Sequence, residues 1–198
     1  MKKKKVITII IIVVVVLAIY AWIKGSYNGM VTRQEGVEAQ WSQVENVYQR
    51  RADLIPNLVA TVKGYAAHEE GTLTAVIEAR TKATSITIDP SELDPEDIAR
   101  FQAAQDQLSG ALSRLLVTVE QYPDLKANEN FLTLQSQLEG TENRIAVERQ
   151  KFNSSAMSYN QYIRMFPRNI IANMFDFEKV GYFKAAAGSE VAPKVDFQ

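Results

Sequence analysis

The 198-residue sequence contains no cysteine and only one histidine, His68. The lack of cysteine excludes disulfides, thiolate metal ligands, cysteine nucleophiles and a lipidated cysteine. A single histidine excludes metal sites built from several histidines. The glycine loops GxGxxG and GxxxxGK[ST] are also missing, so ATP-dependent chemistry is not supported. Little conventional catalytic chemistry remains, and we expect no cofactor.

Charge is absent from residues 6–23, VITIIIIVVVVLAIYAWI. At about 1.5 Å of rise per residue this helix would span roughly 27 Å, which nearly matches the hydrocarbon core of a bilayer. Since no A-x-A-like cleavage site follows, we predict an uncleaved signal anchor, with a cleaved signal peptide as the alternative. The lipid bilayer is thus the first expected partner, through residues 6–23.

Basic residues flank the apolar span unequally. The tail of residues 1–5 carries four lysines, whereas Lys24 alone follows the span closely. The positive-inside rule predicts a single-pass protein of the cell membrane with a cytoplasmic N-terminus and an extracytoplasmic C-terminal domain. Five of the 22 basic residues lie in residues 1–25, which hold no acid, so the rest has 17 basic and 23 acidic residues and a net charge of −6. This mildly acidic body argues against nucleic acid as a partner.

Three stretches beyond residue 27 hold a seven-residue apolar repeat, and no long strand-like alternation is present. The first combines two columns: Met30, Val37, Val44, Leu58, Tyr65, interrupted by Arg51, and Trp41, Tyr48, Ile55, Val62. The second is Ile98, Phe101, Leu108, Leu112, Leu115, Val119, Tyr122. The third is Phe131, Leu138, Ile145, Phe152, Tyr159, Phe166. Each pattern is that of a long helix burying one stripe.

Stop signals separate these stretches. Asp94 before Pro95 predicts a capped helix start, and Pro123 and Pro167 predict helix ends before them. Asn128 is a candidate N-cap, and a shorter helix should open after Gly71 with Thr72 as its cap. We therefore predict an all-α fold: an N-terminal transmembrane helix, then an antiparallel up-and-down four-helix bundle with long helices over residues 27–176. Residues 177–198 read as a loosely ordered tail.

A parallel coiled coil made by several chains, and hence a homo-oligomer, remains the alternative architecture. The proline and the turns within the chain make it the weaker one. Pro56 interrupts the helical stretch RRADLIPNLVATVKGYAAHE, yet the heptad phase continues on both sides. This continuity predicts one kinked helix, with Asn57 and the turn before it taking up the freed backbone groups.

Few residues suggest chemistry. His68-Glu69-Glu70 is half of a zinc-binding HExxH motif, but position 72 is threonine, so a surface helix end is the favoured interpretation. A cluster of acidic residues could bind calcium weakly, although loop solvation and helix capping explain it better. Its members are Asp89, Glu92, Asp94, Glu96 and Asp97.

Two charged residues interrupt the apolar columns, Arg51 in the first and Glu148 in the third. They could pair in the bundle core, or their side chains could extend to its rim. Ser154, Ser155 and Ser158 have no histidine near in sequence to activate them. None of these residues indicates catalysis.

The sequence resembles the bacterial LemA family over nearly its whole length. The matching segments are Tyr27-Asn28, WSQVENVYQRRADLIPNLVATVKGYAAHE at 41–69, Ala79-Arg80, EQYPDLKANENFLTLQSQLEGTENRIAVERQKFN at 120–153, and the YN and FP pairs at 159–160 and 166–167. The resemblance implies a membrane-anchored four-helix bundle of unestablished molecular function and no catalytic residues.

Two functional hypotheses follow. The favoured one is a non-enzymatic scaffold or protein-interaction module of the cell envelope, bound to an unidentified envelope protein. Its candidate interaction surface is the set of polar residues beside the proline, Arg50, Asp53 and Asn57. The alternative is a hydrolase or metal-dependent enzyme that uses His68 and nearby carboxylates.

Overall fold

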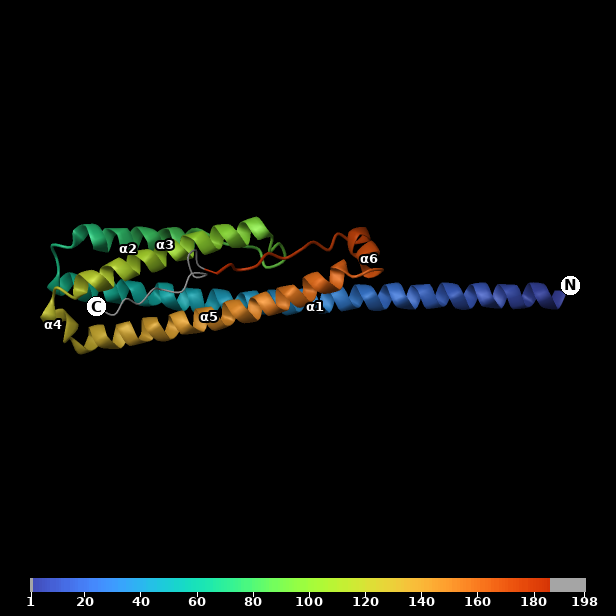
Figure 1. Ribbon diagram of the computed structural model, residues 1–198, viewed down its shortest axis with the longest axis horizontal. Helices are drawn as coiled ribbons and strands as arrows, with labels where there is room; N and C mark the ends of the chain where they lie inside the picture. Colours follow the sequence, from blue (N-terminus) through green and yellow to red (C-terminus); the bar gives the residue numbers. More distant parts are fainter. Residues whose placement is uncertain (1, 186–198) are drawn as a thin grey trace, which may run out of the picture.

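The computed structural model describes residues 2–185, in which every regular element is a helix. Four long helices alternate in direction: α1 (Lys2–Tyr65), α2 (Glu70–Ser85), α3 (Pro95–Val119) and α5 (Glu129–Arg164). Two short helices, α4 (Pro123–Lys126) and α6 (Arg168–Met174), lie at opposite ends of the bundle (Figure 1). The predicted all-α fold with an up-and-down helical bundle is confirmed.

α1 is one uninterrupted helix of 64 residues, and its N-terminal part projects well beyond the bundle (Figure 1). By length and composition this part could cross a membrane: an 18-residue window has a mean hydropathy of 3.2, and none of it is buried against the rest of the protein. The C-terminal part of the same helix packs mainly against α5, while α2 and α3 pack mainly against each other. A rigid helical connection therefore joins the apolar span to the bundle.

The heptad columns are the core. They form two apolar clusters stacked along the bundle. The cluster nearer the apolar span, here the proximal cluster, centres on Trp41, whose ring meets Phe101 and Phe152 edge-on at centroid distances of 5.2 and 5.5 Å. The distal cluster contains Ile55, Leu58, Val62, Leu112, Leu115 and Phe131. Burial of these stripes is the main term stabilising the bundle.

The helix boundaries follow the stop signals with one exception. Asp94 caps α3, its Oδ1 accepting hydrogen bonds from the backbone N–H groups of Glu96 and Asp97 at 2.7 and 2.8 Å. Asn128 caps α5 by accepting from the N–H of Phe131 at 3.1 Å. The predicted cap Thr72 is wrong, because α2 already begins at Glu70 without a side-chain cap.

The segment after α6 corrects the expectation of a loose tail for residues 177–185. It returns along the bundle as an extended chain (Figure 1), and Phe183 is 5% exposed within the proximal cluster. The side-chain amides of Asn160 and Asn153 hold this segment. Asn160 donates to the carbonyl of Val180 and accepts from its N–H, and Asn153 does the same with Phe183, at distances of 2.8–3.0 Å. Residues 186–198 of the predicted tail lie outside the described residues.

Candidate functional site

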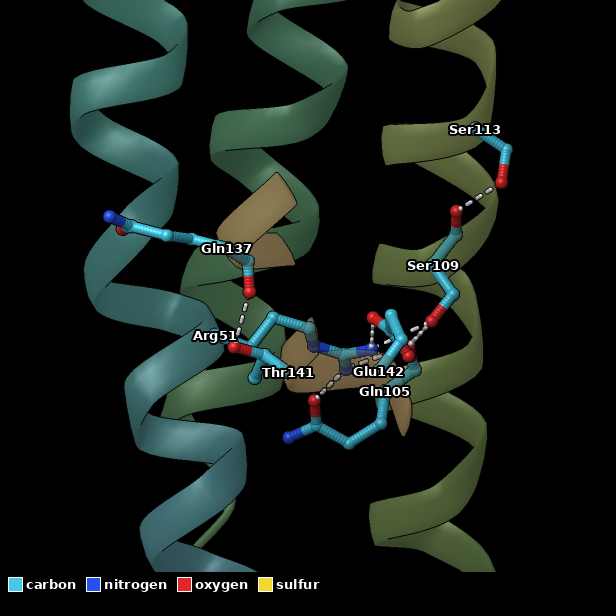
Figure 2. A network of polar contacts seen from close by, with 7 residues as sticks. All are labelled: Arg51, Gln105, Ser109, Ser113, Gln137, Thr141 and Glu142. Atoms are coloured by element: carbon cyan, nitrogen blue, oxygen red, sulfur yellow. Dashed lines mark hydrogen bonds and ion pairs between the residues drawn. The ribbon is translucent and has the colours of Figure 1, made fainter. Parts of the chain in front are cut away.

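Arg51 is the charged residue of the first heptad column, and it lies fully buried at the level where the two apolar clusters meet. Only 1% of it is exposed. Its guanidinium reaches α3 and α5 (Figure 2): Nη1 donates to Ser109 Oγ at 2.8 Å and to Glu142 Oε1 at 2.7 Å. Nη2 donates to the side chain of Gln105 at 2.5 Å and to its carbonyl at 3.3 Å.

Arg51, Gln105, Ser109 and Glu142 form a polar belt that extends across the bundle. Gln105, itself buried, donates through Nε2 to the Ala83 carbonyl of α2 at 3.3 Å, so all four long helices contribute to the belt. Ser113 and Thr141 donate to carbonyls of their own helices, those of Ser109 and Gln137 (Figure 2). The belt thus fixes the register of the four helices, because a shift of any one would leave a buried polar group unpaired.

The expected pairing of Arg51 with Glu148 is wrong, and so is the alternative that the Arg51 side chain reaches the rim. Glu142 is the carboxylate that balances the buried guanidinium, with its side chain 44% exposed. Glu148 instead accepts from Lys151 at 2.8 Å and from Gln40 at 2.7 Å. The hydrogen bond from the Lys151 ammonium lowers the pKa of the Glu148 carboxyl, assisted by Gln40.

A second interhelical contact replaces the hydrogen bond that Pro56 removes from α1. Proline has no N–H, so the carbonyl four residues back, that of Ala52, loses its intrahelical donor. Arg80 of α2 supplies the replacement: its Nε donates to the Ala52 oxygen at 2.8 Å. The expectation that Asn57 and the preceding turn take up the freed groups is therefore wrong for this carbonyl. α1 nevertheless continues as one helix through Pro56, as predicted; a kink there stays a prediction.

The predicted surface residues Arg50, Asp53 and Asn57 are all exposed on the solvent side of α1, next to the exposed Pro56. Asp53 accepts a hydrogen bond from Gln49 Nε2 at 2.7 Å, one turn back on the same helix. The three side chains share a face but line none of the clefts found in the described residues. They form an open, charged helix surface.

His68 lies exposed in the turn between α1 and α2. Its neighbour Glu69 is occupied by a structural contact, because the Tyr122 hydroxyl donates to it at 2.9 Å. Within residues 2–185 no group of three or more His, Asp or Glu side chains is placed to hold a metal ion. The metal-dependent alternative therefore has no ligand set around His68 in the described chain.

The other candidate groups serve local structure. Asp89 of the acidic loop accepts from the backbone and hydroxyl of Ser91 at 2.9 and 2.7 Å, and Asp94 caps α3. The Ser154 hydroxyl donates to the Gln150 carbonyl at 2.9 Å, as helical serines commonly do. These contacts agree with the capping interpretation of the acidic loop.

Sequence patterns did not reveal an acidic cleft of about 430 Å³ between α1, the loop at 90–94 and residues 176–180. Burial raises the pKa of Tyr159, which lines the cleft, to about 12, with the Glu178 and Glu38 carboxylates adding to the shift. Partial burial also raises the pKa of Glu38. The acidic lining of the cleft favours cationic over anionic occupants.

Comparison with known proteins gives a consistent set of relatives. The sequence model of the LemA family matches residues 40–197. The chain is 30% identical over 185 residues to magnetosome protein MamQ 2 of Paramagnetospirillum magneticum, covering 85% of this chain and 68% of that protein. It is 29% identical to magnetosome protein MamQ of Magnetospirillum gryphiswaldense, over 79% of this chain and 64% of the relative. Protein LemA of Metamycoplasma hominis is 26% identical, over 82% and 70% respectively.

Proposed function

The chain belongs to the LemA family, and from that premise we propose that it is a membrane-anchored, non-enzymatic scaffold. It holds a rigid helical rod next to the bilayer and presents this rod to an envelope protein. The observation that carries the proposal is that the polar side chains inside the bundle bond one helix to another. Arg51, Gln105 and Glu142 are engaged in holding helices in register, as is Arg80 at the proline. Groups that are engaged in structural contacts of this kind are poor candidates for reacting with a substrate.

The anchor supports the membrane part of the proposal. The apolar segment of α1 has no packing partner in the described protein and continues without a break into the bundle. Lipid is the environment in which such a surface is stable. With four lysines before the span and Lys24 after it, the bundle would stand outside the cytoplasm.

The orientation has a direct test because the chain has no cysteine. Val117 on α3 is 69% exposed, so Val117→Cys introduces one accessible thiol without disturbing the core. A membrane-impermeant maleimide applied to intact cells should label it, whereas labelling only after lysis would reverse the orientation.

The face formed by Arg50, Asp53 and Asn57 is the proposed contact with the partner protein. A photo-reactive residue placed at 50, 53 or 57 in cells should crosslink to another envelope protein, and the same residue at Val117 serves as the matched exposed control. The charge reversal Asp53→Lys should abolish the crosslink formed at position 50. Crosslinks of equal yield at 117, or recovery of the protein with itself alone, would contradict a scaffold that acts through this face.

A further inference from the structure

Five large apolar side chains lie exposed within eleven residues around α6. Met165, Phe166, Ile170, Met174 and Phe175 are 53%, 81%, 54%, 65% and 46% exposed. We call this set the apolar foot. A contiguous surface of this kind is rare on a soluble protein and marks a site that another apolar phase covers.

The apolar foot sits where the apolar span meets the bundle. α6 lies at the end of the bundle from which α1 projects (Figure 1), and the ring of Phe175 meets Tyr27 edge-on at 4.9 Å between centroids. Gly29 lies directly against Tyr162, since a Cβ at Gly29 would come within 2.8 Å of the Tyr162 ring carbon bearing the hydroxyl. Because α5 runs antiparallel to α1 and ends at Arg164, two residues beyond that contact, the chain leaves α5 on the side of the contact that faces the span.

The arrangement of α6 shows that this exposure is not a failure to pack. Ile171 and Ala172 are each 2% exposed and anchor the helix in the proximal cluster. Ile170 and Met174 are four residues apart and therefore share another side of α6, while Phe166 is exposed in the turn that precedes the helix. α6 has one side inserted in the protein and a second apolar side without a protein partner in the described chain.

Basic residues accompany the apolar foot. Arg164 and Lys24 are exposed at the same end of the bundle. Arg168 lies over the Tyr162 ring at 4.1 Å from its centroid. Apolar side chains bordered by arginine and lysine are the composition of segments that lie in a membrane interface, where the cations meet lipid phosphates.

We propose that the apolar foot inserts into the interfacial layer of the same bilayer that residues 6–23 cross. The bundle is then held at two points, the span and the foot, which restricts its tilt and rotation relative to the membrane surface. The inference rests on the proposed membrane anchoring. It commits to lipid as the occupant because the foot is continuous with the apolar span through Tyr27.

The test uses the full chain in vesicles of phosphatidylcholine and phosphatidylglycerol. Single cysteines carrying a nitroxide replace Phe166 or Met174 in the foot, Val14 in the span and Val117 on the far surface of α3. Electron paramagnetic resonance measures how often each label collides with oxygen, which concentrates in lipid, and with a neutral nickel chelate, which stays in water. Val14→Cys reports on the anchoring alone, and Val117→Cys gives the value for a label in water.

Labels at 166 and 174 are expected to show an oxygen-to-nickel ratio several-fold above that at 117, approaching that at 14. A water-like ratio at 166 and 174, with a lipid-like one at 14, would overturn the foot and leave the anchor standing. Low collision with both reagents at 166 would overturn it in favour of a second copy of this chain covering the foot. A water-like ratio at 14 would overturn anchoring and foot together.

Discussion

The contact between Arg80 and the proline in α1 gives the sharpest test of how this bundle is held together. Pro56 deprives the Ala52 carbonyl of its intrahelical donor, and Arg80 Nε replaces it at 2.8 Å across the interface between α1 and α2. Ala52 is 3% exposed, so water cannot readily serve the carbonyl if the arginine is removed. A hydrogen bond from a charged donor contributes about 1.5–3 kcal/mol, and an orphaned buried acceptor costs about 1–3 kcal/mol.

Because Arg80 is half-buried, the lower part of that range applies. Arg80→Ala should lower the free energy of unfolding by about 1–2 kcal/mol. In a Pro56→Ala background the N–H of residue 56 returns and bonds the Ala52 carbonyl, so the same Arg80→Ala change should cost about 0.5 kcal/mol or less. Pro56→Ala alone should leave the fold intact and raise stability, because a proline in a helix interior costs up to about 3 kcal/mol.

Urea unfolding of the four variants in detergent micelles, followed by the fluorescence of the buried Trp41, measures the coupling energy of this double-mutant cycle. We expect a coupling of about 1 kcal/mol or more. Lys82→Ala is the matched control, since Lys82 also donates across to α3, to Gln107 at 2.9 Å, but in an exposed position. It should cost less than about 0.5 kcal/mol. An Arg80→Ala cost that is equal with and without Pro56 would refute the assignment.

Three further changes test other contacts. Arg51→Ala should destabilise by about 3 kcal/mol in urea unfolding, because it leaves a cavity and an unpaired Gln105; the similarly long Arg51→Met fills the cavity but still leaves Gln105 unpaired, so it should cost less than Arg51→Ala without being neutral. Asn153→Ala removes both hydrogen bonds between the Asn153 side chain and the backbone of Phe183. Since about 1.4 kcal/mol corresponds to a factor of ten, amide exchange at Phe183 should become about tenfold faster or more; unchanged exchange would contradict the role given to Asn153. Glu38 has a pKa raised by burial above about 4.5, so its ionised form is disfavoured in the fold. Glu38→Gln should therefore stabilise at pH 7, and this gain should vanish as the pH falls through the raised pKa towards 4.5; a gain independent of pH would contradict it.

The helix pattern was predictable from residues close together in the chain. The heptad columns from Met30 to Val62 and from Phe131 to Tyr159 are buried as their spacing predicts. The columns fail only at their ends: Tyr65 is 47% exposed at the distal end, and Phe166 is 81% exposed at the end near the span. A repeat reports which side of a helix is apolar, but it does not tell protein from lipid as the apolar surroundings.

The polar contacts were not predictable in the same way. Arg51 and Glu148 both interrupt apolar columns, yet Arg51 pairs with Glu142 because the register of α1 against α5 brings that residue to the guanidinium. The sequence also marked Pro56 as a defect without indicating where its compensation lies. The donor, Arg80, is 28 positions away from the carbonyl it serves.

The order of residues 177–185 depends on long-range contacts in the same way. Their composition is that of loose chain, and the hydrogen bonds that hold them come from Asn153 and Asn160 on α5 and from Gln102 on α3. Such amide contacts with an extended backbone leave no periodic pattern in the sequence.

By itself, then, the sequence determined the apolar span, the number and direction of the long helices and the capping of α3 and α5, because each depends on residues within a few turns of one another. The tertiary structure alone decided which carboxylate balances Arg51, which donor serves the Ala52 carbonyl, where the last described segment lies and which apolar side chains stay uncovered beside the span. Those outcomes depend on the axial register and rotation of one helix against another, which are set only when the packed core closes.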